Sequence, residues 1–443
     1  MEKCAKDQKE LKFYIHTFGC QMNESDSERI SGILTASGAK ISDSPEKSDL
    51  IIVNTCAVRE KSEEKLYSYL GNLASLKKSK KVSIGVVGCV AQLYRSGLLE
   101  KKPFIDFILG PDNYHRLSHI LRSNQGEKFI STGWSPELHE IPHELVFRKS
   151  NISAYLTIME GCNNFCSYCI VPFTRGREKF RHKHNIIREV QSLARKGYKE
   201  IQLLGQNVNS YKDPETGKDF SALLKEINHV DGIEWIRFIT SHPKNFSKDF
   251  ASTMKEAKKV CHQLHLPIQS GSSSVLERMN RGYTREEYLE KITFILDLMP
   301  DMSLSTDIIV GFPGETEEEF QETLSLLKEV RYTNIFSFRY SPRPLTTASR
   351  EKDTVPFEEK KRRLIEVQGL QKKLQLELNK SQVGCVIKVL CSGKSKKDPH
   401  IYTGRNEGHQ VVNFKSQKNV TDKFVDVRIT ACGPYSLIGE VTP

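Results

Sequence analysis

The sequence contains no apolar run that approaches the ~20 residues needed to cross a bilayer. Its first residues, MEKCAKDQKELKFY, are charged and lack the apolar core of a secretion signal. We therefore expect a cytosolic protein without a membrane partner. In a reducing compartment the 11 cysteines do not predict a disulfide framework, so metal binding or catalysis is the better interpretation of them.

Composition places the chain among globular proteins of several domains. Its 443 residues exceed one ordinary core, so two or three domains are expected. The shares of hydrophobic residues (38%) and charged residues (27%) are typical of globular proteins. The formal net charge of +11 favours a polyanionic partner such as nucleic acid, although charge also serves solubility and non-specific attraction.

The first third of the chain alternates between buried strands and helices. Apolar segments at 13–20, 49–56 and 82–89 read as strands, each followed by an amphipathic or charged helix, and 104–110 reads as a fourth strand. Continuous apolar strands with intervening helices predict a parallel sheet that is covered on both faces.

A mixed stretch at 123–150 reads as a linker, after which the alternation of strands and helices resumes at Ala154. Six strand–helix units predict a TIM-like partial (β/α)6 barrel, whose chemistry lies at the carboxyl ends of its strands. A long charged helix follows, and beyond about residue 382 short strands with polar turns predict a small antiparallel β-barrel. The expected domains are therefore 10–128, 148–378 and 379–443.

Three cysteines, Cys162, Cys166 and Cys169, stand in C-x3-C-x2-C spacing just after a predicted strand. A zinc site would need a fourth ligand, most simply His182 or His184, but zinc loops usually pair their cysteines and no second pair follows. Three thiolates suit a 4Fe–4S cluster in which one iron stays open for a small molecule.

A second set of three cysteines is Cys20, Cys56 and Cys89, each of which ends a predicted parallel strand. Singly, each could be an ordinary buried cysteine. The carboxyl ends of neighbouring parallel strands share one edge of a sheet, where ligands usually bind. Convergence there predicts a second cluster site with three protein ligands.

The spacing of the first set, with the aromatic Tyr168 before its last cysteine, resembles the signature of radical S-adenosylmethionine (SAM) enzymes. The whole order of domains resembles the methylthiotransferases of that superfamily, which end in a β-barrel called TRAM. TFGCQMNESDSE, NTCAVREKSEEK and GCNNFCSYCIVPFTRGRE resemble the branch that acts on isopentenylated adenosine beside the tRNA anticodon. After Cys20 this chain has Gln21 and Met22, where the protein-modifying branch typically has proline and the threonylcarbamoyl-adenosine branch a lysine–valine pair.

The resemblance implies a transferase of tRNA processing that inserts a methylthio group at carbon 2 of N6-dimethylallyladenosine. It implies a 4Fe–4S cluster on each cysteine set and two SAM molecules per turnover. One SAM donates a methyl group to a sulfur on the auxiliary cluster, and the other is the source of a 5′-deoxyadenosyl radical. It also implies a tRNA anticodon stem-loop as partner, an electron donor such as flavodoxin or ferredoxin, and a monomer.

Beyond the six cysteines, no catalytic side chain is expected. Polar residues at strand ends are the candidate SAM contacts, namely Tyr168, Gln206, Asn207, Gln269, Ser270, Asp307 and Gly311. Basic residues after the cysteine loop and in the C-terminal barrel are the candidate RNA contacts, namely Arg175, Arg177, Lys179, Arg181, Lys388 and Arg405.

Two alternatives stay open at this point. The same chemistry could serve threonylcarbamoyl-adenosine or a ribosomal-protein side chain. A protein of a different class, an iron–sulfur RNA-binding scaffold that never cleaves SAM, would share the cysteines and the basic surface.

Overall fold

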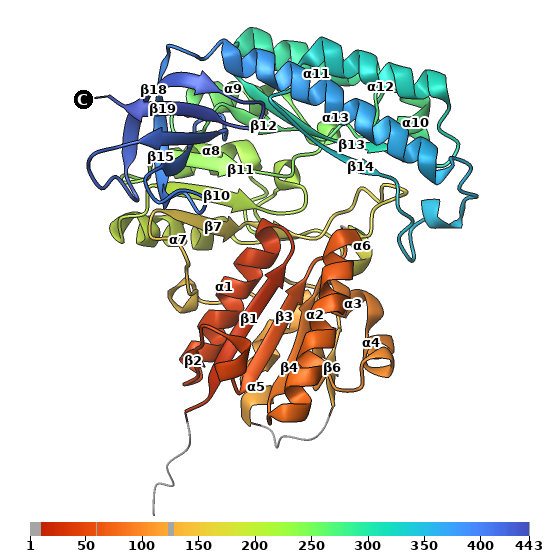
Figure 1. Ribbon diagram of the computed structural model, residues 1–443, viewed down its shortest axis with the longest axis vertical. Helices are drawn as coiled ribbons and strands as arrows, with labels where there is room; N and C mark the ends of the chain where they lie inside the picture. Colours follow the sequence, from red (N-terminus) through yellow and green to blue (C-terminus); the bar gives the residue numbers. More distant parts are fainter. Residues whose placement is uncertain (1–9, 59, 123–127, 443) are drawn as a thin grey trace, which may run out of the picture. The chain divides into compact units, whose positions relative to one another are not determined.

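The N-terminal part of the computed structural model is a six-stranded sheet whose strands all run parallel (Figure 1). The structure describes residues 10–58, 60–122 and 128–442. The sheet has the order β2-β1-β3-β4-β5-β6. Its strands are β1 (Lys12–Phe18), β2 (Lys40–Ile41), β3 (Leu50–Thr55), β4 (Ser83–Gly88), β5 (Phe107–Leu109) and β6 (Phe129–Ser131).

Helices cover both faces of this sheet because its central strands are apolar on both sides. Ile51 and Val53 of β3 pack in one core cluster with residues of α2, whereas Leu50 and Ile52 pack in a second with residues of α1. The predicted parallel sheet with two covered faces is confirmed. The helices are α1 (Gln21–Ala36), α2 (Glu60–Ser79), α3 (Cys89–Tyr94), α4 (Ser96–Lys101) and α5 (Leu117–Arg122).

The contacts of the chain divide it into two compact units. The first unit comprises the residues up to Lys149 together with Thr157–Asn163 and Cys169–Arg181, and the second unit comprises the rest. Besides the sheet, the first unit holds β8 (Met159–Glu160), α6 (Val171–Thr174) and β9 (Lys179–Phe180). β6 lies within the stretch that the sequence pattern predicts as a linker, because an edge strand of three residues leaves little periodic signal.

The second unit contains the predicted partial barrel. Two three-stranded sheets, β7-β10-β11 and β12-β13-β14, are linked by an isolated parallel bridge between Ile236 and Val260, so the six strands follow one another in chain order. The strands are β7 (Ser153–Thr157), β10 (Glu200–Leu204), β11 (Trp235–Phe238), β12 (Gln263–His265), β13 (Ser303–Val310) and β14 (Asn334–Arg339).

Helices alternate with these strands along the chain, and several of them are capped at the N-terminus by a side chain that accepts a backbone hydrogen bond. The Thr316 hydroxyl accepts a hydrogen bond from the Glu319 amide (3.3 Å), and the Glu319 carboxylate accepts one from the Thr316 amide (2.9 Å). The helices are α7 (Lys183–Arg195), α8 (Phe220–Asn228), α9 (Lys248–Glu256), α10 (Ser273–Arg278), α11 (Arg285–Leu298), α12 (Glu317–Val330) and α13 (Phe357–Lys380).

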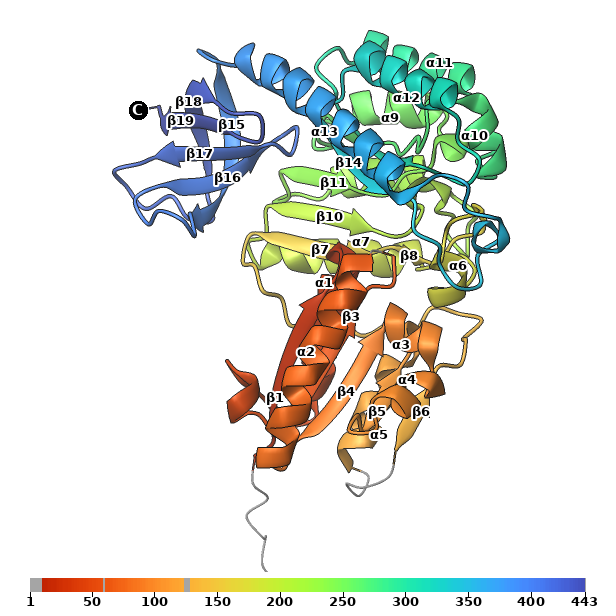
Figure 2. The ribbon, with the colours of Figure 1, turned by 45° about the vertical axis from the view of Figure 1, so that its right-hand side comes forward.

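α13 leads into a closed five-stranded barrel, which Figure 2 shows at its end. Four pairs of neighbouring strands are antiparallel, but β17 and β19 run parallel. A closed ring with an odd number of strands cannot alternate direction throughout, so the expected antiparallel barrel must contain one parallel pair. The strands are β15 (Val386–Lys394), β16 (Tyr402–Asn406), β17 (Val411–Lys415), β18 (Phe424–Cys432) and β19 (Leu437–Val441).

Within the second unit the small barrel docks on the larger one through a buried arginine. Arg237 of β11 binds the Glu200 carboxylate through Nε (2.6 Å) and donates from its Nη atoms to the backbone oxygens of Asn406 (2.7 Å) and Glu407 (2.5 Å). The Trp235 and Phe424 rings meet edge to face beside it. Among the described residues, no helix is long and apolar enough to cross a membrane.

Candidate metal centres

The first unit brings three cysteines to one edge of its sheet. β1, β3 and β4 are neighbours, and their last paired residues, Phe18, Thr55 and Gly88, are in register. Cys20, Cys56 and Cys89 follow these strand ends, as predicted. Hydrogen bonding between Cys20 and Cys56, and the interaction of both with Cys89, show that the three thiols are close together. We call this group the strand-edge set.

The thiols of the strand-edge set differ in acidity. The hydrogen bond with Cys56 and the charge of Arg175 lower the pKa of Cys20 to about 6. The same bond raises the pKa of Cys56, together with burial, and burial raises the pKa of Cys89. Metal ions bind thiolates, so metal binding here would release the remaining protons.

Two buried amides hold the Cys20 end of the set. The Asn23 carboxamide accepts from the Cys20 backbone amide (3.4 Å) and donates to the Asn54 carboxamide (3.1 Å), which in turn donates to the backbone oxygen of Asn23 (2.8 Å). A Cβ on Gly88 would lie 2.4 Å from the Asn54 oxygen, and Gly88 has a φ of +91°. Glycine is therefore required before Cys89, because both the space and the backbone exclude a side chain.

A buried guanidinium contacts the opposite end of the set. Nε of Arg175 lies 3.3 Å from Cys89 Sγ, and Nη2 lies 2.5 Å from the Asp26 carboxylate. The Nη1 atom of Arg175 is buried without a hydrogen-bond partner. Three converging thiols beside an unused cationic donor fit an anionic group that carries sulfur acceptors, as a 4Fe–4S cluster with three cysteine ligands does.

The other three cysteines lie in the loop between β8 and α6, and we call them the loop set. Cys162 and Cys169 belong to the first unit, where the Cys162 amide donates to the Gly176 oxygen (3.1 Å). Cys166 belongs to the second unit and is buried. Its sulfur accepts from Nη1 of Arg281 at 3.3 Å.

Arg281 organises the second-unit part of the loop. Its Nη1 also lies 3.3 Å from the Tyr168 hydroxyl, and its Nη2 donates to the Pro267 oxygen at 2.6 Å. His242 approaches Cys166 Sγ with Nε2 at 4.0 Å. Burial and the nearby Arg281 charge lower the pKa of His242 to about 2, so its ring is neutral.

The candidate SAM contacts fall into two groups by their surroundings. Asp307 of β13 lies 3.7 Å from His265 Nε2 of β12, and the Gln269 amide donates to the Asp307 backbone oxygen. The Tyr168 hydroxyl and the Cys166 sulfur both contact Nη1 of Arg281. Gln206 and Asn207 follow the end of β10. These five remain predicted contacts at strand ends.

The remaining two candidates, like Asn207, whose Nδ2 donates to Asn245 Oδ1 at 3.1 Å, have internal partners. Ser270 is fully buried, and its hydroxyl lies 3.3 Å from that of Thr323. The amide of Gly311 donates to Glu315 Oε2 at 2.5 Å. Their positions favour support of the turns that follow β12 and β13, and direct SAM contact by these two stays a prediction.

The basic run after the loop set is mostly buried and paired. Arg175 pairs with Asp26, Lys179 with Asp112 (2.5 Å) and Arg181 with Glu140 (3.1 Å). Arg177 is exposed. Burial of the three paired cations favours a structural role, and phosphate contact by this run stays a prediction.

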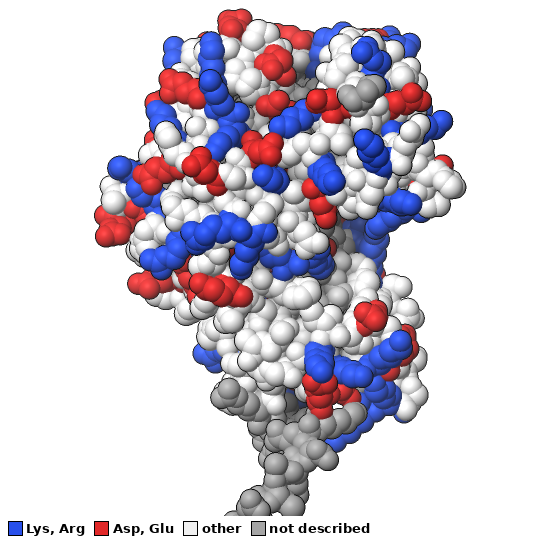
Figure 3. All heavy atoms as spheres, turned by 90° about the vertical axis from the view of Figure 1, so that its left-hand side faces the viewer, with Lys and Arg blue, Asp and Glu red and all other residues white. Residues whose placement is uncertain are grey.

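Basic residues of the C-terminal barrel are more accessible. Lys388 and Arg405 are exposed; Lys388 pairs with Glu234 (2.9 Å) and lies over the Phe424 ring, and Arg405 donates to the His409 oxygen (2.8 Å). Figure 3 views the molecule from the left-hand side of Figure 1 and shows a band of lysine and arginine side chains on that face, with acidic side chains beside it. Their contact with RNA stays a prediction.

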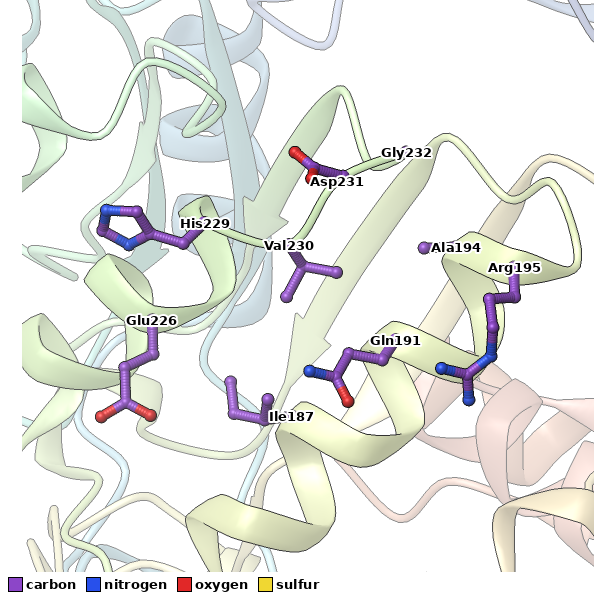
Figure 4. Close-up of a pocket in the computed structure, with 9 residues that line it drawn as sticks. All are labelled: Ile187, Gln191, Ala194, Arg195, Glu226, His229, Val230, Asp231 and Gly232. Atoms are coloured by element: carbon purple, nitrogen blue, oxygen red, sulfur yellow. The ribbon is translucent and has the colours of Figure 1, made fainter.

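Two other features of the second unit, a group of metal-ligating side chains and a surface hollow, contain no cysteine. His182 and His184 lie with Glu215, their ligand atoms within 4.8 Å of one another, and His184 and Glu215 are exposed. An open hollow between α7 and α8, lined by Gln191, Glu226 and His229 among others (Figure 4), lies among outer helices and has no cysteine in its lining.

Sequence reasoning missed Arg281, Asp26 and Asn23. Arg281 sits in a turn and carries no motif of its own. Asn23 and Asp26 offered a signal in the sequence, because their spacing of three residues puts them on one face of the expected helix. In the structure both lie on the buried face of α1. Polar residues in the stripe that should be apolar indicate a site beneath that helix.

Comparison with known proteins follows the three parts of this architecture. Family models match residues 12–110 (Uncharacterized protein family UPF0004), 156–327 (Radical SAM superfamily) and 380–442 (TRAM domain). The solved structure of the radical SAM methyltransferase TsrM from Kitasatospora setae superposes with a TM-score of 0.57 at 12% identity, covering 89% of this chain and 77% of that chain. The cobalamin-dependent radical SAM enzyme OxsB gives 0.51 at 13% identity, covering 82% of this chain and 56% of that one, so this chain spans about half of OxsB.

At such identities the structural likeness concerns the fold alone, and together with the family models it defines a radical SAM protein with a TRAM domain. Curated relatives are closer in sequence. The tRNA-2-methylthio-N(6)-dimethylallyladenosine synthase of Geobacter metallireducens is 46% identical over 439 residues, which cover 98% of each chain. That of Acetivibrio thermocellus is 44% identical over 444 residues, covering 99% of this chain and 92% of the relative. This chain belongs to the tRNA-2-methylthio-N(6)-dimethylallyladenosine synthase family, which confirms the resemblance.

Proposed function

We propose that this chain is a radical SAM methylthiotransferase that adds a methylthio group to carbon 2 of N6-dimethylallyladenosine next to the anticodon of tRNA. The observation that carries this proposal is the pair of three-cysteine sets. The strand-edge set accompanies the C-x3-C-x2-C loop in a single chain, and relatives of nearly the same length bear the name of this activity.

In this proposal each cysteine set holds one 4Fe–4S cluster. When bound, the loop cluster with SAM supplies the radical chemistry that removes an aromatic hydrogen, which no protein side chain can do. The chain contributes binding and orientation. Arg281 holds the Cys166 sulfur and the Tyr168 hydroxyl in place, and the neutral His242 ring packs beside them.

The candidate SAM contacts at the strand ends are Asp307, Gln269, Gln206 and Asn207, with Tyr168 beside the cluster. Asp307 and His265 form the most defined polar pair there, because His265 Nδ1 is held by the Ser305 hydroxyl at 3.0 Å. A carboxylate at such a position can bind an ammonium or ribose group of the cofactor.

The C-terminal barrel is proposed to bind the anticodon stem-loop. Exposed lysines such as Lys394, Lys396 and Lys415 lie on its strands and loops. Small β-barrels bind looped RNA through charge and stacking, and the target base must leave its stack before it can react. Residues 10–128, 148–378 and 379–443 are the proposed functional domains.

The proposed partner besides tRNA is a one-electron donor such as flavodoxin or ferredoxin, because the reductive cleavage of SAM consumes one electron. We place the enzyme in the cytoplasm, where its substrate occurs and where thiols stay reduced, and expect a monomer.

Anaerobic reconstitution of the wild type and of the Cys20/Cys56/Cys89→Ala variant tests the pair of clusters. We expect about eight irons per chain to fall to about four. Four irons in both proteins would contradict the proposal.

Activity on anticodon stem-loops then tests the substrate. We expect a methylthio product from stem-loops that carry the isopentenyl group and none from those that lack it. Product from threonylcarbamoyl-adenosine or a ribosomal-protein peptide would indicate the corresponding alternative. A wild type that binds iron but never forms 5′-deoxyadenosine would identify a scaffold.

A further inference from the structure

Arg175, a basic residue of the first unit, touches a cysteine sulfur. It follows α6 directly and is 2% exposed, so almost all of its side chain is shielded from water. Nε lies 3.3 Å from Cys89 Sγ, and Nη2 lies 2.5 Å from Asp26. A guanidinium has a rigid fork of donors, so these two contacts fix the direction of the third nitrogen as well.

A buried network holds this guanidinium in place. Asp26 is fully buried and accepts a further hydrogen bond from the Tyr114 hydroxyl at 3.2 Å. Its second oxygen faces Arg29 at 3.7 Å, and Arg29 binds Glu160 at 2.9 Å. The two arginines and two carboxylates balance in charge, so the network is stable only as a connected whole.

Charge balance alone does not explain the geometry at Cys89. A simple ion pair with Asp26 uses only Nη2, whereas Nε is directed at sulfur and Nη1 is buried with no partner. A buried donor without an acceptor costs about 1–3 kcal/mol, and more when charged. An acceptor at the strand-edge set would remove that cost.

We propose that Arg175 is a positioning residue of the strand-edge centre, which binds the Cys89 sulfur through Nε and offers Nη1 to a sulfur of the cluster that Cys20, Cys56 and Cys89 hold. The inference rests on the proposed function, which assigns a 4Fe–4S cluster to these cysteines. Hydrogen bonds and positive charge at cluster sulfurs favour the more negative, reduced state. Arg175 therefore raises the reduction potential of this cluster and slows the loss of its iron.

The test isolates the strand-edge cluster in the full chain. The parent protein carries Cys162, Cys166 and Cys169 replaced by alanine, so that iron can bind only at the strand edge. Arg175→Gln and Arg175→Lys are introduced into it. Redox titration followed by electron paramagnetic resonance gives the midpoint potential, and the rate of iron loss to a chelator gives the kinetic stability.

We expect Arg175→Gln to shift the midpoint to a more negative potential. We expect the rate of iron loss to increase about 10–100-fold, in proportion to the loss of metal affinity that usually follows removal of an outer-shell partner. Arg175→Lys keeps the charge but loses the fork, so its potential should lie between those of the parent and of Arg175→Gln. It also keeps the inference testable if the glutamine variant fails to fold.

The matched control is Lys179→Met/Asp112→Asn, which removes another buried ion pair of the same unit. We expect the control to change thermal stability without moving the midpoint potential. Equal potentials and iron-loss rates in the parent and both Arg175 variants would overturn the inference while leaving the cluster intact. A parent that binds no iron would instead contradict the proposed function.

Discussion

The two cysteine sets reach the same ligand number by different routes. The loop set lies within one short segment, so local spacing defines it. The strand-edge set comes from the ends of three neighbouring strands, and the register of a parallel sheet brings it together. One site can therefore be read as a motif, whereas the other exists only when the sheet has formed.

A buried arginine contacts a sulfur in each set, but the two arginines are held differently. Arg175, at Cys89, binds the carboxylate of Asp26. Arg281, at Cys166, is held by neutral oxygens, namely the Pro267 carbonyl and the Tyr283 hydroxyl (2.8 Å). Because a carboxylate compensates the charge of Arg175, the strand-edge site depends on a network, whereas Arg281 keeps its positive charge beside the Cys166 sulfur.

The largest expected effect is a loss of product that differs between variants of the two cysteine sets. Cys166→Ala should reduce formation of 5′-deoxyadenosine to the background of the assay, because the loop cluster is the proposed site of SAM cleavage. Cys56→Ala should lose the methylthio product but still cleave SAM. Chromatography of both products in one reaction measures this difference, and loss of SAM cleavage in Cys56→Ala would show that the sites are not independent.

Asp26→Asn should have the next largest effect, because it leaves Arg175 buried without its counter-charge. We expect it to destabilise the first unit by about 3–5 kcal/mol. Hydrogen exchange of peptides from each unit measures it, with Glu319→Gln in the second unit as control. Glu319 pairs with the partly exposed Arg278, so the control should lose only about 1 kcal/mol. Equal losses of stability in Asp26→Asn and Glu319→Gln would contradict the inference that Asp26 belongs to a buried charge network.

Gly88→Ala should disturb the strand-edge set alone. The new Cβ would clash with Asn54 and the backbone φ is +91°, so we expect a loss of about 2–4 kcal/mol and of the strand-edge iron. Gly38 is the matched control, since its φ is +90° but its Cβ position is open. Gly38→Ala should cost about 1–2 kcal/mol and keep all iron. Chemical denaturation and iron analysis compare the two variants.

The smallest effect concerns the acidity of Cys20 in the iron-free protein. Its pKa of about 6 lies below the ordinary value of 9.0, so the reactive thiolate appears as the pH rises through about 6. Labelling by iodoacetamide, followed by mass spectrometry across pH, should have its midpoint there. Cys56→Ala removes the hydrogen bond that lowers this pKa, so the midpoint should move to higher pH. An unchanged midpoint would contradict the coupling of the two thiols.

Much of the fold could be predicted because its patterns are local. The apolar strands before Cys20, Cys56 and Cys89 and the charged helices between them indicate a parallel sheet without any knowledge of contacts. The short edge strand β6 was missed, since three residues carry no periodic signal. The parallel pair β17–β19 was missed because it follows from closure of the barrel, which no single segment encodes.

The sequence by itself determined the order of the domains, the loop set and the family, because these depend on residues that are near one another in the chain. Only the tertiary structure decided what surrounds the sulfurs. Arg175 and Arg177 look equivalent in the sequence, yet one is buried at Cys89 and the other is exposed. The physical reason is that burial and charge pairing depend on residues distant in the chain, such as Asp26, which only folding places beside Arg175.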